Sequence, residues 1–137
     1  MKGDILIIED NDQNLYLVTF LLEKHGYLVH AARDGMEGVA RAAALRPDLI
    51  LLDIQLPGMD GYTVARHLRE NPDLASVPII AVTSYAMTGD REKALEAGCT
   101  GYIEKPINPD TFMQQVENHL NETTRKGGEN HGPNTGR

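Results

Sequence analysis

Acidic, hydroxyl and basic side chains stand at the ends of several predicted strands in this chain, and their types suit metal and phosphate chemistry. Glu9 and Asp10 follow an apolar run at residues 5–8, and Asp53 follows another at 49–52. Thr83 and Lys105 end two later strands. Carboxylates that share one small space repel each other by roughly 3 kcal/mol per pair at ~5 Å and an effective dielectric of ~20. A cation, the Lys105 ammonium or a raised carboxyl pKa must therefore offset the repulsion.

Hard oxygen ligands with few anchoring side chains suit Mg²⁺, which keeps several of its waters and commonly adds a phosphate oxygen. A carboxylate can also act as a nucleophile and form an aspartyl phosphate. Phosphoryl transfer needs little from a protein beyond positioning and charge stabilisation. A magnesium ion, a lysine and a hydroxyl would supply that stabilisation here.

Strands and helices that alternate along the chain must position these groups. The short, nearly continuous apolar runs are typical of strands buried on both faces of a parallel sheet. Such strands are predicted at residues 4–8, 28–32, 49–52, 77–83 and 100–105. Helices with caps and stop signals are predicted between them and after the last, at residues 12–25, 35–45, 61–70, 88–97 and 109–120. The carboxyl ends of parallel strands share one sheet edge, where ligands gather in open α/β folds.

The expected faces and ends of three helices are specific enough to be tested. His25 is predicted to lie on the apolar stripe of the first helix with Leu15, Val18 and Leu22. The second helix is predicted to bury Met36, Val39, Ala40 and Ala43. The last helix is expected to begin with Asn108 as its cap and Pro109 at its first position.

Composition narrows the class of protein. The chain has 137 residues, a net charge of −7 and a single cysteine. This length suits one domain, and the acidic balance argues against nucleic acid or an anionic membrane as a partner. One cysteine allows no internal disulfide, which fits a reducing compartment. No apolar run approaches the ~20 residues of a membrane span, so we expect a cytoplasmic protein.

An ordered set of residues spread over all five strand–helix units carries a resemblance to a known family. The set comprises Glu9-Asp10, Asp53, Pro57 with Asp60-Gly61, Thr83-Ser84, Tyr102 and Lys105-Pro106. It resembles the receiver domain of two-component response regulators, and within that family the stand-alone DivK and CheY types. The resemblance implies a doubly wound (βα)5, flavodoxin-like fold with a five-stranded parallel sheet in the order 2-1-3-4-5. It makes residues 1–121 the receiver domain and leaves 122–137 as a polar tail, which we expect to be disordered.

The resemblance implies a role for each residue that matches the motif. Asp53 would be the phosphoacceptor. Asp10 and Asp53 would bind Mg²⁺ directly, together with the backbone carbonyl of Gln55, and Glu9 would act mainly through water. Glu9 is a mild departure, since many members have aspartate at this place.

Further roles follow from the same resemblance. Thr83 and Lys105 would each bind a phosphoryl oxygen, and the Lys105–Pro106 peptide bond would be cis. Tyr102 would turn inward as Thr83 moves toward the phosphate. Gln55 and Tyr85 would tune dephosphorylation, and neither is an acid that could orient water. We therefore expect slow loss of phosphate.

The function implied is that of a single-domain response regulator in a phosphorelay. It would accept a phosphoryl group from the phosphohistidine of a histidine kinase or a histidine phosphotransfer protein. It would then signal to a protein target through the fourth helix, fifth strand and fifth helix. It would be a phosphoacceptor rather than an enzyme with a substrate of its own, and we expect a monomer before phosphorylation.

Other functions that the sequence allows are less well supported. A haloacid-dehalogenase-type phosphatase would have an acid two residues after its nucleophile, where this chain has Gln55. A nucleotide carrier of the flavodoxin type would need a glycine-rich phosphate loop where Glu9 and Asp10 stand. A receiver that docks partners without phosphate, or one that was excised from a larger regulator, remains open.

Overall fold

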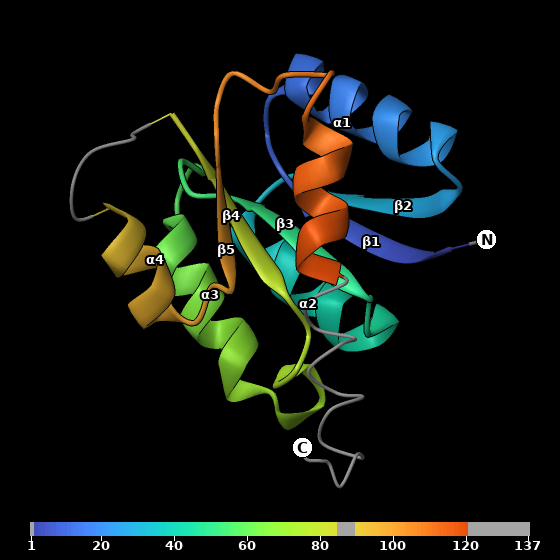
Figure 1. Cartoon of the computed structure of the whole chain (residues 1–137). Coiled ribbons are helices and arrows are strands. Elements are labelled where there is room, and N and C mark those ends of the chain that lie inside the picture. The colour runs from blue at the N-terminus through green and yellow to red at the C-terminus, as the bar shows by residue number, and fades with distance from the viewer. Residues whose placement is uncertain (1, 85–89, 121–137) are drawn as a thin grey trace, which may run out of the picture.

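The structure, a computed structural model, describes residues 2–84 and 90–120 (Figure 1). Its five strands form one parallel sheet in the order β2-β1-β3-β4-β5, which confirms the predicted fold. The strands are β1 (Gly3–Ile8), β2 (Tyr27–Ala32), β3 (Leu49–Asp53), β4 (Ile79–Thr83) and β5 (Gly101–Glu104). The helices are α1 (Asp12–Lys24), α2 (Gly35–Leu45), α3 (Gly61–Glu70) and α4 (Asp90–Ala97), with a 3₁₀ turn η1 (Pro72–Leu74) and a last helix through residues 112–120. The predicted tail at 122–137 lies outside the described residues.

Two apolar layers sandwich the sheet because alternate strand residues point to opposite faces. In β1, Leu6 and Ile8 pack in the cluster that α2, α3 and α4 complete, whereas Ile5 and Ile7 pack in the cluster beneath α1 and the last helix. Figure 1 shows these helices on the two sides of the sheet. β3 is buried along its whole length, so its carboxyl end is held by core packing on both faces.

The predicted face of α2 is wrong for three of its four residues, whereas Val39 is partly buried and packs against the core. Met36 is 75% exposed, and Ala40 and Ala43 are exposed as well. The buried positions are Gly35, Gly38 and Ala42. A Cβ at Gly38 would lie 2.5 Å from the Ile8 side chain, so the absence of side chains lets α2 approach the sheet closely. The apolar-periodicity argument missed this because it gave glycine no weight.

Two helix ends also differ from expectation. His25 is exposed and follows the last residue of α1, where its Nδ1 lies 2.9 Å from the Leu21 carbonyl oxygen. Leu21 takes the buried position instead. Asn108 accepts from the Asp110 N–H at 2.9 Å, but residues 109–111 form a turn before the helix begins at Phe112. The side-chain bond to the residue two places on favours such a turn.

Among the described residues, no helix is long and apolar enough to cross a membrane. The Lys105–Pro106 peptide bond is cis, as the sequence resemblance implied.

The turn from β3 into α3 is tightly packed at Gly61. The Asp60 carboxylate caps α3 by accepting from the Tyr62 and Thr63 N–H groups at 2.9 and 3.1 Å. The Gly61 N–H donates to the Ile54 carbonyl at 2.9 Å. A Cβ on Gly61 would lie 2.4 Å from the Ile54 Cα, which is backbone and cannot rotate away.

Gly61→Ala should therefore lower the free energy of unfolding by about 1–3 kcal/mol, the usual cost of overpacking. It should also shift the amide resonances of Ile54 and Gln55 in NMR spectra. Gly58→Ala is the control, because a Cβ there meets nothing within 4 Å and adds only the strain of a φ of +80°. A Gly61→Ala protein as stable as the wild type would contradict the close packing.

Candidate functional site

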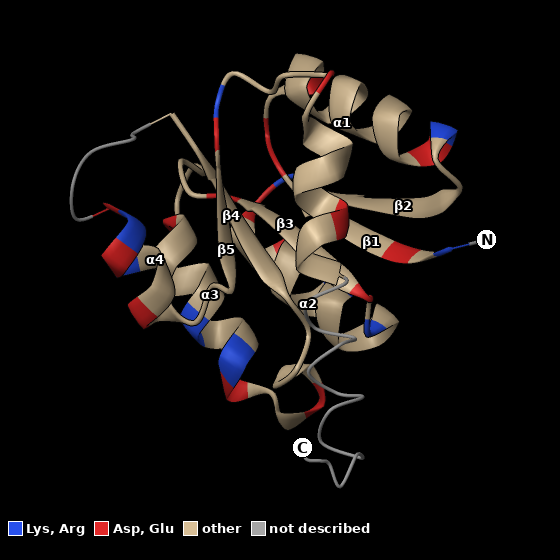
Figure 2. Ribbon diagram, in the orientation of Figure 1, with Lys and Arg blue, Asp and Glu red and all other residues tan. Residues whose placement is uncertain are grey.

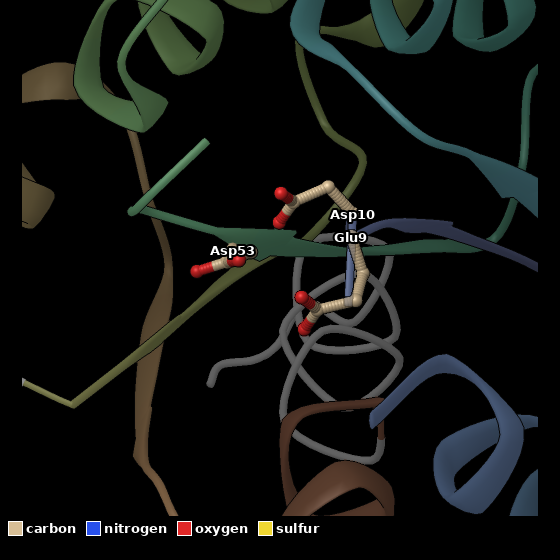
Figure 3. A group of neighbouring side chains, drawn as sticks. All are labelled: Glu9, Asp10 and Asp53. Carbon is tan, nitrogen blue, oxygen red and sulfur yellow. The ribbon is translucent and has the colours of Figure 1, made fainter. Parts of the chain in front are cut away.

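Three carboxylates meet at the carboxyl edge of the sheet (Figure 3). Glu9 and Asp10 follow β1, and Asp53 is the last residue of β3. The pairing of Ile8 with Leu52 places the ends of these adjacent strands side by side. One oxygen from each carboxylate lies within 4.8 Å of the others. The parallel topology thus brings together acids that are more than forty residues apart in sequence.

Lys105 joins two of these acids. Its Nζ lies 3.3 Å from Glu9 Oε1 and 3.3 Å from Asp53 Oδ1, and its side chain is only 11% exposed. The Lys105 N–H also donates to the Thr83 carbonyl at 2.8 Å, which fixes the end of β5 against the end of β4. In a partly buried setting such contacts are much stronger than on an open surface. The ammonium therefore offsets part of the repulsion between the two carboxylates.

Glu9 is the acid whose protonation the site disturbs most. It is 5% exposed, and its Oε2 accepts from the Asn11 N–H at 3.1 Å. Burial, together with a hydrogen bond to Asp53 and the negative charge of Asp53, raises the pKa of Glu9 to about 7. Asn11 and Lys105 act in the opposite direction but do not cancel this effect. The charged form of Glu9 is thus disfavoured by its burial and by the carboxylate beside it.

Asp53 and Asp10 differ in exposure. Asp53 is 3% exposed, and its Oδ1 accepts from the Gln55 N–H at 2.9 Å. Asp10 is exposed, so the cluster opens to solvent on that side. A ligand that arrives from solvent can therefore reach buried Asp53 past exposed Asp10.

The remaining predicted residues surround the same edge where the structure describes them. Thr83 ends β4, between β3 and β5, and is 1% exposed. Tyr102, on β5, is half-buried and packs against the cluster beneath α3 and α4. Tyr85 lies outside the described residues. The structure thus places Thr83 beside the acid cluster and Tyr102 farther back along the neighbouring strand.

The donor set fits a magnesium ion. All three clustered side chains offer carboxylate oxygens, and the described part of the chain holds no other such cluster of acids, histidines or cysteines. Mg²⁺ prefers oxygen ligands and keeps waters, which the open side at Asp10 accommodates. Burial and the neighbouring Asp53 raise the pKa of Glu9, and a cation bound here would favour the ionised form of this acid.

A contact at this site that the sequence did not reveal involves the side chain of Gln55. Its carbonyl oxygen accepts from the Ser84 N–H at 3.0 Å, and so joins the segment after β3 to the segment after β4. No sequence pattern could have shown this, because the contact depends on the direction in which one flexible side chain points.

Comparison with known proteins decides the family. The family model of the response regulator receiver domain matches residues 5–117. The chain belongs to the response regulator receiver family. The receiver is also 41% identical over 120 residues to the polar-differentiation response regulator DivK of Brucella anthropi, covering 88% of this chain and 98% of DivK.

Solved receivers share the fold. The receiver domain of the sensor histidine kinase PA1611 from Pseudomonas aeruginosa superposes with a TM-score of 0.81 at 36% identity, covering 88% of this chain and 99% of that one. That structure has a magnesium ion coordinated in its active-site cleft. A putative response regulator from Chloroflexus aurantiacus gives a TM-score of 0.82 at 30% identity, with 88% and 98% covered.

The raised pKa of Glu9 predicts how stability depends on pH. The folded protein holds this proton up to about pH 7, whereas the unfolded chain releases it near 4.5. The stabilisation is complete below the unfolded value and is lost as the pH rises through the folded one. Between pH 5 and pH 8, Glu9→Gln should therefore gain stability over the metal-free wild type by on the order of 2 kcal/mol.

Urea unfolding of both proteins in EDTA would measure this difference at each pH. Groups far from Glu9 titrate alike in both proteins and cancel in the comparison. Glu92→Gln, at an exposed position of α4, is the control and should show a constant difference. A difference for Glu9→Gln that does not change with pH would mean that Glu9 ionises normally.

Proposed function

We propose that this receiver accepts a phosphoryl group on Asp53 and passes the signal on by a change of conformation. The observation that supports this most directly is the Lys105 ammonium, which lies 3.3 Å from both the Glu9 and the Asp53 carboxylates. A cation that already touches the acceptor is placed to respond to charge that arrives there. We take the donor to be a phosphohistidine of a histidine kinase or a histidine phosphotransfer protein.

The residues that would hold Mg²⁺ are Asp10, Asp53 and the backbone carbonyl of Gln55, with Glu9 acting mainly through water. When bound, the ion would neutralise charge on the acids and on the phosphoryl oxygens. The protein side chains would do the rest. Buried Asp53 would be held by the Gln55 N–H with one oxygen directed away from that bond.

The transfer itself would form one bond and break one. A carboxylate oxygen of Asp53 would attack phosphorus while the phosphorus–nitrogen bond to the donor imidazole breaks, and the leaving imidazole would take up a proton from solvent. Lys105 and the Thr83 hydroxyl would each bind a phosphoryl oxygen, which stabilises the charge spread over those oxygens. Lys105 would have to loosen its contact with Glu9 to do so.

The signal would reach a partner protein through the surface formed by α4, β5 and the last helix. Thr83 and Lys105 join the site to β4 and β5, and the main-chain bond between them links the two strand ends. Tyr102 on β5 would be the aromatic residue that reports the movement. Leu95 on α4 is 49% exposed and offers apolar surface to a partner protein.

Nucleic acid is not the partner we propose. The net charge is −7, and Figure 2 shows basic and acidic residues interleaved along α4. A protein target, an unphosphorylated monomer and a cytoplasmic location fit this charge distribution. We propose no substrate beyond the phosphoryl group, so the protein would act as a signalling phosphoacceptor rather than as an enzyme.

A phosphorylation assay tests the proposal. A small phosphodonor with Mg²⁺ should add one phosphoryl group to the wild type, seen by mass spectrometry, and none with EDTA or in Asp53→Asn. Lys105→Ala should still be phosphorylated but should lose the spectral change at Tyr102, because the ion pair reports the arrival of phosphate. Equal labelling of Asp53→Asn would refute the acceptor. No labelling of the wild type would favour a module that binds partners without phosphate.

The lifetime of the phosphoprotein gives a second test. Hydrolysis needs a water aligned opposite the Asp53 oxygen. We propose that Gln55 and Tyr85 flank that approach, and that neither can orient the water as an acid would. Decay should therefore be slow, and Tyr85→Glu should speed it in a time course of phosphate loss. Fast decay in the wild type, or no change in either Tyr85→Glu or Tyr85→Ala, would exclude this role.

A further inference from the structure

Gln55 is the one residue seen to bond both to Asp53 and to the segment that follows β4, within the described part of the chain. Its N–H donates to Asp53 Oδ1 at 2.9 Å, and its side-chain carbonyl accepts from the Ser84 N–H at 3.0 Å. The proposed function uses the backbone of Gln55 and its place beside the water path. It assigns nothing to the bond with Ser84.

The register of the sheet shows that this bond lies close to the acceptor. Asp53 is paired with Val82 across β3 and β4, and the Ile54 N–H donates to the Val82 carbonyl at 3.1 Å. Adjacent strands run about 4.8 Å apart. Ser84 is two residues beyond Val82 and Gln55 is two beyond Asp53, so the two segments leave the sheet side by side. A group of phosphoryl size on Asp53 would therefore come within reach of the Ser84 N–H.

The chemistry of the two acceptors predicts a competition. The Gln55 carbonyl is neutral, whereas phosphoryl oxygens carry negative charge and accept hydrogen bonds roughly twice as strongly. The Ser84 N–H donates to a side chain rather than to the main chain of a neighbouring strand, so its partner can be replaced. Thr83, its neighbour, is fully buried at the end of β4. A change of partner at Ser84 would therefore act on the peptide next to Thr83.

We infer that Gln55 is a positioning residue that occupies the Ser84 N–H until an anionic oxygen on Asp53 replaces it. This inference rests on the proposed phosphoacceptor function. The exchange would cost the wild type one hydrogen bond each time the site is loaded. Gln55 thereby sets how readily the Ser84 N–H changes from its resting partner to the anionic one.

Three substitutions separate this role from a merely structural one. Gln55→Met keeps the length of the side chain and the backbone carbonyl but removes the acceptor. Gln55→Glu keeps the acceptor, makes it anionic and so strengthens its hold on Ser84. Gln115→Met makes the same glutamine-to-methionine substitution at an exposed position of the last helix and serves as the control.

Hydrogen exchange in the metal-free protein tests the bond without any chemistry at Asp53. The Ser84 amide should exchange several-fold faster in Gln55→Met and no faster in Gln55→Glu or Gln115→Met. The Lys105 amide, which donates to Thr83 within the strand ends, should not change. Unaltered exchange at Ser84 in Gln55→Met would show that the bond does not hold that segment, and would overturn the inference.

Binding of beryllofluoride, an anionic mimic of a phosphoryl group, tests the competition. At saturating Mg²⁺, Gln55→Met should reach half-saturation at a beryllofluoride concentration about two- to tenfold lower than the wild type, since no bond to Gln55 need be broken. Gln55→Glu should need a higher concentration, and Gln115→Met should match the wild type. Changes in Ser84 and Tyr102 resonances would follow the titration.

The outcomes separate the inference from the function on which it rests. Equal or weaker binding by Gln55→Met, with normal binding by the wild type, would overturn the inference and leave the phosphoacceptor function standing. Failure of every protein to bind beryllofluoride would overturn the function and the inference together. Tighter binding by Gln55→Met at an unchanged melting temperature would support the competition, because a structural defect would weaken binding and lower the melting temperature.

Discussion

Two buried carboxylates held by one buried ammonium are the interaction on which this site depends. Glu9 and Asp53 are each about 5% exposed or less, and a buried charge is costly unless it is paired. Lys105 lies 3.3 Å from both, yet burial and the neighbouring Asp53 still raise the pKa of Glu9 to about 7. A divalent cation at this site would favour the ionised form of Glu9.

The rest of the fold keeps these three groups in place. Core packing on both faces holds the ends of β1 and β3, and the bond between Lys105 and Thr83 holds the end of β5. Gly38 of α2 lets that helix approach Ile8, directly before the acidic pair. Gly61 likewise has no side chain and lets the start of α3 pack closely against the Ile54 backbone, next to Asp53. Each is a backbone or packing feature that fixes an acid without touching its carboxylate.

Sequence reasoning predicted the sheet, its edge and the convergence of the acids, because buried strands and their end residues follow from the spacing of apolar residues. It failed where residues with little or no side chain decide the packing. The face of α2 was misplaced because Gly38 lies against Ile8 of the sheet and Gly35 against Val64 of α3, whereas Met36 is exposed. The bond from Gln55 to Ser84 depends on a rotamer, and the turn at residues 109–111 depends on a local choice of hydrogen-bond partner. Neither leaves a periodic signal.

Lys105 stands after an edge strand, yet its ammonium reaches across β4 to the acid on β3. The Lys105 ammonium thus lies at the acid cluster, whereas the main chain of Lys105 directly follows β5 at the edge of the sheet. Thermodynamic linkage makes such a connection work equally in both directions. A target that binds β5 more tightly in one of its positions must change the affinity of the acids for their ligand by the same factor. A partner protein that binds β5 in this way would take part in setting how tightly the acid cluster holds its ligand.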